Sequence, residues 1–223
     1  MVKNKPVYAF EEADSKKRML LGGKGAGLSE MTRLKLPVPP GFTITTEVCN
    51  KYYDNNGKLP KDVMPAVMKN IAKMEKKTGK KWNSTKNPLL VSVRSGAAIS
   101  MPGMMDTILN LGLNEKTVEG FAEQTKNPRF SWDSYRRFIQ LFGKVVFGVN
   151  DEKFDHVLDA AKEKQGVIDD SKLNVESLKQ IVSKYKKICE EHTKRKFPDT
   201  PDEQLVLSIE AVFKSWMGER AIV

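Results

Sequence analysis

The sequence has little of several residue types on which enzymes commonly depend. Its 223 residues include two histidines, His156 and His192, and two cysteines, Cys49 and Cys189. None of the four is spaced as a catalytic pair or as a metal ligand, so no Ser-His-Asp arrangement and no metal cluster is expected. The cysteines are predicted to be buried thiols of a reducing compartment rather than a disulfide.

Long apolar runs are missing as well. No stretch approaches the ~18 residues of a membrane span. The first 20 residues mix charged and apolar positions and lack the apolar core of a signal peptide. We therefore expect a globular cytoplasmic chain that does not bind a membrane.

The charge is unbalanced in one direction, with a formal net charge of +10. One interpretation is a basic module that binds nucleic acid or another polyanion. However, the lysine clusters at 76–81 and 184–196 lie near the ends of helical patterns, where cations are common. No aromatic residues alternate with them to stack on bases, so we expect no nucleic-acid partner.

The first hundred residues alternate between strand and helix patterns. A glycine loop separates the first strand from a short helix with Leu28, Met31 and Leu34 on one face, and further helices are predicted at 46–52 and 60–77. The predicted strands are 6–10, 42–45 and 88–93, the last of them buried and ending at Arg94.

From about Asn114 to Phe197 only helices are predicted, opening at Ser131, Asp151 and Asn174. A last helix begins with the capping box Thr200-Pro-Asp-Glu203 and precedes a strand-like start at 220–223. The pattern predicts an α+β fold with an inserted helical subdomain. The expected division is an α/β subdomain over 1–112, a helical subdomain over 113–198, and a returning helix and strand start over 199–223.

Two glycine-rich motifs could hold an anion. Gly22-Gly-Lys-Gly-Ala-Gly27 precedes a helix, so its backbone N–H groups could approach a phosphate while Lys24 adds a full charge. The spacing matches neither the P-loop nor the dinucleotide motif. The alternative is a tight glycine turn with a solvated lysine.

The second motif runs from Val93 to Gly112 and follows a predicted strand. Arg94 is suited to binding phosphate oxygens, although it could instead pair with a structural carboxylate. Met101, Met104 and Met105 suit a mobile loop that packs on a ligand, or they could fill a core. Asp106 and Thr107 are predicted to cap the next segment.

Together these stretches resemble the N-terminal part of pyruvate, phosphate dikinases. The residues that carry the resemblance are 21–31, 38–42, 91–112, 135–143, 212–216 and 220–223. Phosphoenolpyruvate synthases share the first motif and a Val-Arg-Ser strand end but lack the Met-Pro-Gly-Met-Met-Asp-Thr loop, so the dikinases are preferred.

The resemblance implies an ATP-grasp nucleotide-binding domain in an enzyme that converts ATP, phosphate and pyruvate into AMP, pyrophosphate and phosphoenolpyruvate. By position, Lys24 and Arg94 would bind the ATP phosphates and act in catalysis. Gly103, Met104 and Met105 would form the loop over the nucleotide, and Thr107 would belong to the same site. Family resemblance also implies a homodimer formed through other domains.

Departures from the family pattern limit what this chain is expected to do. The phosphohistidine motif, the pyruvate-binding barrel and the second ATP-grasp half with its Mg²⁺ ligands are not found in the sequence. We expect a catalytically inert fragment that relies on a phosphohistidine domain elsewhere in the full-length chain. The competing interpretations are a synthase-type ATP-binding domain, a basic nucleic-acid-binding module, and a regulatory or scaffold protein with degenerate motifs.

Overall fold

The computed structural model describes residues 4–96 and 107–216. The chain forms two compact units. The first comprises Met1–Lys80, Arg94–Asp106 and Ile209–Val223, and the second comprises Lys81–Val93 and Thr107–Ser208. The expected division at 112 and 198 stays a prediction about subdomains. No helix among the described residues is both long enough and apolar enough to cross a bilayer.

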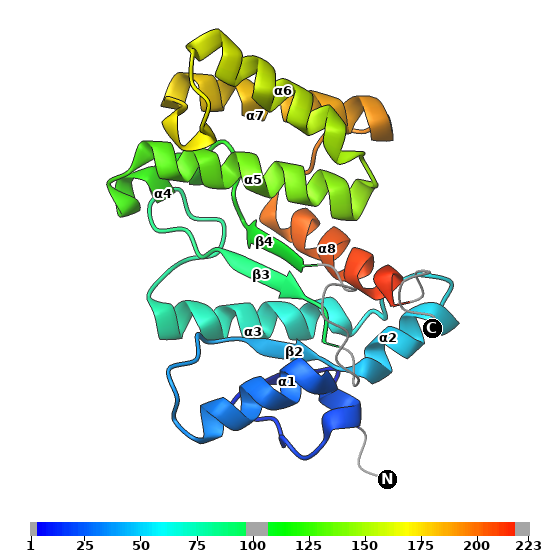
Figure 1. Ribbon diagram of the computed structural model, residues 1–223. Helices are drawn as coiled ribbons and strands as arrows, with labels where there is room; N and C mark the ends of the chain where they lie inside the picture. The colour runs from blue at the N-terminus through cyan, green and yellow to red at the C-terminus, as the bar shows by residue number, and fades with distance from the viewer. Residues whose placement is uncertain (1–3, 97–106, 217–223) are drawn as a thin grey trace. The chain divides into compact units, whose positions relative to one another are not determined.

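The first unit is built around a small antiparallel sheet. Strand β1 (Val7–Ala9) pairs with β2 (Phe42–Ile44), with Val7 opposite Ile44. Helix α1 (Arg18–Arg33) packs against β2 (Figure 1). Helix α3 (Val63–Thr78) packs against β1. Helix α2 (Thr46–Asp54) packs against α1. The core of this unit is formed by Val7, Ala9, Val48, Cys49, Tyr52, Val63, Val67, Ile71 and Phe213.

Local sequence signals explain where helix α3 forms and where it ends. In α3 the buried residues Val63, Val67 and Ile71 recur at helical spacing. The helix ends at Gly79, whose φ of +70° is the left-handed conformation that glycine adopts without steric cost.

The second unit is mainly helical. Strand β3 (Val91–Arg94) and strand β4 (Thr107–Leu111) form a two-stranded sheet, and α5 (Pro128–Phe147) packs against β4. Figure 1 shows α5 between this sheet and the helices α6 and α7. The helices of this unit are α4 (Thr117–Thr125), α5, α6 (Asp151–Gln165), α7 (Val175–Thr193) and the first part of α8 (Pro201–Ser215), with a 3₁₀ turn at Asp170–Lys172.

Asparagine caps and buried aromatic rings stabilise this helical layer. The side chain of Asn127 caps α5, that of Asn150 caps α6, and that of Asn174 caps α7, each accepting a backbone hydrogen bond. The aromatic core consists of Tyr135, Phe138, Phe142, Phe154, Tyr185 and Phe197.

A buried cation fixes the turn between α6 and α7. Arg136 is 2 % exposed and donates to Asp133 at 2.8 Å and to Asp170 at 3.3 Å. Both carboxylates also accept from Arg137. Because a desolvated guanidinium is costly unless it is paired, these carboxylates keep the 3₁₀ turn on α5.

The expected helix ends in the second half are mostly confirmed, while several features of the first half differ. The glycine cluster is not a separate loop but part of the kinked helix α1. Met31 on α1 and Leu34 just after it are 38 % and 56 % exposed, so the predicted apolar face is not buried at these two residues. Thr107 does not cap a helix but opens strand β4, which the sequence analysis missed together with α4.

Strand β3 is shorter and more exposed than expected. Val91 and Val93 are half-buried, whereas Ser92 and Arg94 are exposed, because β4 is its only partner among the described strands. The mixture of helices with small sheets is an α+β fold. The strand expected at 220–223 lies outside the described residues.

Replacing Gly120 with alanine tests the packing of α4. The new Cβ would lie 2.0 Å from the backbone oxygen of Thr85, so the backbone must shift. We expect Gly120→Ala to lower the free energy of unfolding by about 1–3 kcal/mol in urea denaturation. The control is Gly27→Ala on α1, where nothing lies within 4 Å of the new Cβ and alanine should stabilise the helix. Equal stability of the two variants would contradict the packing.

The pKa of the Glu30 side chain reports on the hydrogen bonds that this residue of α1 accepts. Hydrogen bonds from Arg33 and from Ser15 lower the pKa of Glu30 from 4.5 to about 2. A lowered folded-state pKa favours the folded chain above pH 4.5, and this contribution is lost as the pH falls toward 2. We expect Arg33→Ala to raise the pKa of Glu30, measured by NMR titration of the side-chain carboxyl. An unchanged pKa would mean that the Arg33 hydrogen bond is not made.

Candidate functional site

The first candidate motif forms a break inside helix α1. Gly22 has φ +71° and ψ 166°, outside the helical region, so a second helical segment follows it over 23–33. The first amide groups of a helical segment lack carbonyl partners within it, and they carry the positive end of the helix dipole. Lys24 is exposed in this first turn. This is the arrangement that binds phosphates at helix N-termini.

Contacts with β2 and α2 hold the broken helix in place. A Cβ on Gly25 would lie 2.7 Å from Oγ1 of Thr43, so only glycine lets the helix approach the strand this closely. Before the break, the hydroxyl of Thr46 donates to the carbonyl of Met19 at 2.7 Å. After it, the Ser29 hydroxyl donates to the carbonyl of Gly25 at 2.9 Å. The Thr46 bond thus ties the segment before Gly22 to α2. The close approach of Gly25 to Thr43 ties the segment after it to β2, whereas the Ser29 bond lies within the helix.

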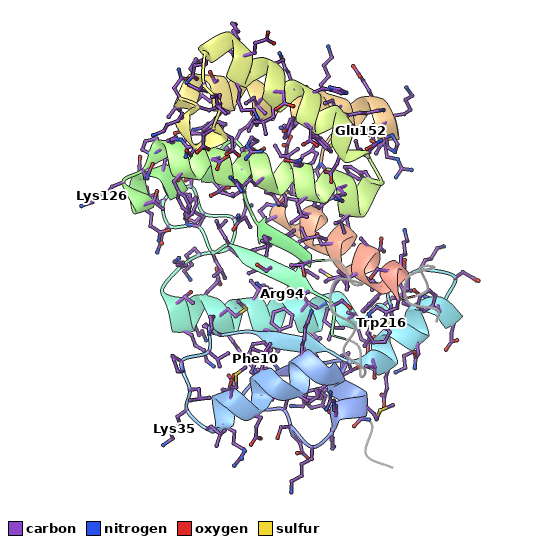
Figure 2. All side chains as sticks on the ribbon, viewed as in Figure 1. Phe10, Lys35, Arg94, Lys126, Glu152 and Trp216 are labelled. Atoms are coloured by element: carbon purple, nitrogen blue, oxygen red, sulfur yellow. The ribbon has the colours of Figure 1, made fainter. Side chains whose placement is uncertain are left out.

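The second candidate motif meets the first at the backbone. A Cβ on Gly22 would lie 1.5 Å from the carbonyl oxygen of Gly96, so these two glycines are in direct contact. A Cβ on Gly96 would lie 3.3 Å from Cβ of Lys24. Arg94 precedes Gly96 by two residues, at the exposed end of β3 (Figure 2). The structure therefore brings the Lys24 motif and the start of the Arg94 motif together within the first unit.

The charged side chains of the candidate site are cationic and exposed to solvent. Lys24 and Arg94 are both exposed, and neither makes an ion pair with another residue of 4–96 or 107–216. The alternative in which Arg94 pairs with a structural carboxylate therefore finds no support in the described part of the chain. Lys24 in the first turn of the helical segment, and Arg94 two residues before the glycine that contacts this turn, suit a phosphate-bearing anion.

Other predicted site residues are not brought to this place. Gly103, Met104 and Met105, with the rest of the Met101–Asp106 loop, lie outside the described residues. Thr107 is half-buried, opens β4 in the second unit and stays a prediction as a site residue. Within the described ranges, no three acidic, histidine or cysteine side chains gather where a metal ion could be held.

Two residues outside the predicted set of site residues support the site. Ser95 is only 2 % exposed, and its hydroxyl accepts a hydrogen bond from the indole of Trp216 at 3.0 Å. Figure 2 shows Trp216 just beyond the end of α8. The sequence pattern places Trp216 on the inward face of the last helix and within the family resemblance, but it assigns Trp216 no role at the site. A serine next to Arg94 gave no local signal for a partner 121 residues away.

A comparison with protein families identifies the family to which the chain belongs. The sequence model described as "Pyruvate phosphate dikinase, AMP/ATP-binding domain" matches residues 18–60 and 55–223. The chain belongs to this dikinase family. Both motifs of the candidate site, Gly22–Gly27 and Val93–Gly112, lie inside the matched residues.

Individual dikinases are similar over nearly the whole chain. Pyruvate, phosphate dikinase of Entamoeba histolytica is 54 % identical over 97 % of this chain, and that of Clostridium symbiosum is 50 % identical over 97 %. The chloroplastic pyruvate, phosphate dikinase 1 of Arabidopsis thaliana is 45 % identical over 99 %. The chain spans only 24 %, 25 % and 23 % of these relatives, respectively.

Gly22→Ala tests the contact between the two dikinase motifs. The new Cβ would collide with Gly96 at 1.5 Å and would also sit at a strained positive φ. We expect a loss of about 2–4 kcal/mol in the free energy of unfolding, the strain and the collision acting together. Urea denaturation measures it.

Gly79→Ala is the control for a positive φ without a collision, because Gly79 has φ +70° and nothing within 4 Å of the new Cβ, while its ψ is 0° and that of Gly22 is 166°. It should show the smaller cost of placing alanine in the left-handed helical region with no collision. Equal destabilisation by the two substitutions would mean that Gly22 and Gly96 are not in contact.

Proposed function

We propose that this chain is the N-terminal nucleotide-binding part of a pyruvate, phosphate dikinase and that it binds the phosphates of ATP at the Gly22–Gly96 contact. The observation that carries the proposal is that contact itself, which places Lys24 beside the residues following Arg94. The family description names AMP and ATP as ligands, and the two cations and the helix N-terminus supply the matching chemistry.

In the longer protein, the proposed reaction is ATP + phosphate + pyruvate → AMP + pyrophosphate + phosphoenolpyruvate, by way of a phosphohistidine on another domain of the same chain. Phosphoryl transfer depends mainly on positioning and on stabilising charge on the phosphoryl oxygens. Lys24 and Arg94 are proposed to supply positive charge, while the amides after Gly22 donate hydrogen bonds. Gly103, Met104, Met105 and Thr107 are proposed to complete the nucleotide site.

The fold and assembly proposals follow from the same family. We assign the first unit to an ATP-grasp-like architecture and expect a cytoplasmic homodimer formed through parts outside this chain. Mg²⁺ prefers carboxylate and phosphate oxygens. Among the described residues no group of three acidic, histidine or cysteine side chains gathers, and we place the protein ligands of Mg²⁺ elsewhere in the longer protein.

The relatives favour the dikinase over the other interpretations. Those compared above are named pyruvate, phosphate dikinases, and no observation in the structure favours a nucleic-acid-binding or scaffold function. We therefore do not retain the hypothesis that the chain is a phosphoenolpyruvate synthase-type domain.

Removing either cation should weaken nucleotide binding. A hydrogen bond to a charged group contributes about 1.5–3 kcal/mol, so Lys24→Ala and Arg94→Ala should each weaken Mg-ATP binding by about tenfold or more. Calorimetry would be done on this chain, in which we expect weak binding, and on a version extended by about 120 residues, a domain-size estimate.

Lys76→Ala is the control, because Lys76 is an exposed lysine on α3 of the same unit. It should leave the affinity unchanged. The proposal fails if the extended chain does not bind ATP, or if both site variants bind as tightly as the unaltered chain.

A further inference from the structure

The end of helix α8 makes a hydrogen bond that reaches the candidate site. The indole N–H of Trp216 donates to Oγ of Ser95 at 3.0 Å, across 121 residues of sequence. An indole nitrogen can only donate, so the serine oxygen is the acceptor and its own proton points away from the ring. The contact is tertiary, and local sequence preferences of either segment do not explain it.

Trp216 is well placed to act as a fixed donor. Its backbone N–H donates to the carbonyl of Phe213 at 3.1 Å, which closes the last turn of the helix. The same carbonyl accepts from the hydroxyl of Tyr53, and the Phe213 ring lies 5.5 Å from the ring of Tyr52. The end of α8 is therefore tied to α2 within the first unit.

The acceptor belongs to the second site motif, next to the point where that motif contacts the first. Ser95 is 2 % exposed, follows Arg94 and precedes Gly96. Gly96 in turn touches Gly22 and Lys24. A shift of Ser95 would therefore move Gly96 away from the break in α1 and change the position of Arg94 relative to Lys24.

We infer that Trp216 is a positioning residue for nucleotide binding: through Ser95 it holds the Arg94–Gly96 segment against the Gly22–Lys24 turn. This inference rests on the proposed function and adds a residue that does not itself contact the nucleotide. The affinity for a phosphate-bearing ligand then depends on an indole N–H at the end of a distant helix.

The test begins with variants that separate the hydrogen bond from packing. Trp216→Phe keeps an aromatic ring but removes the N–H donor, and Ser95→Ala removes the acceptor. The matched control is Trp82→Phe, which also removes an indole hydrogen bond, the 2.6 Å bond to Asp202 within the second unit. Circular dichroism and thermal melting would establish that each variant is folded.

The first readout is amide hydrogen exchange in the ligand-free chain. Losing one buried hydrogen bond should speed exchange by about fivefold at Ser95, Gly96 and the 22–25 turn in both site variants. Trp82→Phe should leave those amides unchanged. If the Trp216–Ser95 bond only stabilised the fold, its loss would instead speed amide exchange throughout the first unit. Unchanged exchange at the 22–25 turn in both site variants would overturn the inference.

The second readout is Mg-ATP affinity by calorimetry. Trp216→Phe should weaken binding by about fivefold and Ser95→Ala by at least as much. The double variant should bind no more weakly than Ser95→Ala alone, because the acceptor of the indole bond is then already gone. Additive losses, or an equal loss in Trp82→Phe, would overturn the positioning role.

The two readouts distinguish failure of this inference from failure of the proposed function. Absence of ATP binding by the unaltered and the extended chains would refute the proposed function, and with it a role of Trp216 in nucleotide binding. Normal binding in the unaltered chain together with unchanged binding in both site variants would refute the inference alone.

Discussion

The first unit depends on one close approach between two backbones. Gly22 and Gly96 contact each other where any side chain on Gly22 would collide with a carbonyl oxygen. The same glycine adopts the positive φ that breaks helix α1 and opens a second helix N-terminus. One residue thus satisfies a steric and a conformational requirement, and both features of the candidate site follow from it.

The remaining contacts of the site maintain this approach from either side. Gly25 lies against Thr43 of β2 and fixes the helical side of the contact. Ser95 is held by Trp216 and fixes the strand side. Chemistry at a phosphate needs donors and cations that are already in place, because reorganising them at the moment of reaction is costly. The exposed Lys24 and Arg94 stand on a backbone that is constrained in this way.

The second unit uses different means of stabilisation. Its helices are capped by asparagine side chains and packed around aromatic rings. Buried Arg136 binds two carboxylates and holds the turn after α6. The chain passes from this unit to the first between Val93 and Arg94, so the predicted phosphate ligand Arg94 lies at the boundary of the two units along the sequence.

The sequence by itself determined the features whose causes lie within a few residues. Asn174 and Gly148 mark helix ends because a side-chain cap or a left-handed glycine acts on the adjacent turn. The family was likewise evident from the order of residues in the two glycine motifs. Only the tertiary structure decided that the first motif breaks a helix, that Gly96 rests on Gly22, and that Ser95 binds Trp216. It also decided that Met31 and Leu34 stay exposed and that Thr107 opens a strand. These outcomes depend on contacts between residues far apart in the chain, which local spacing does not encode.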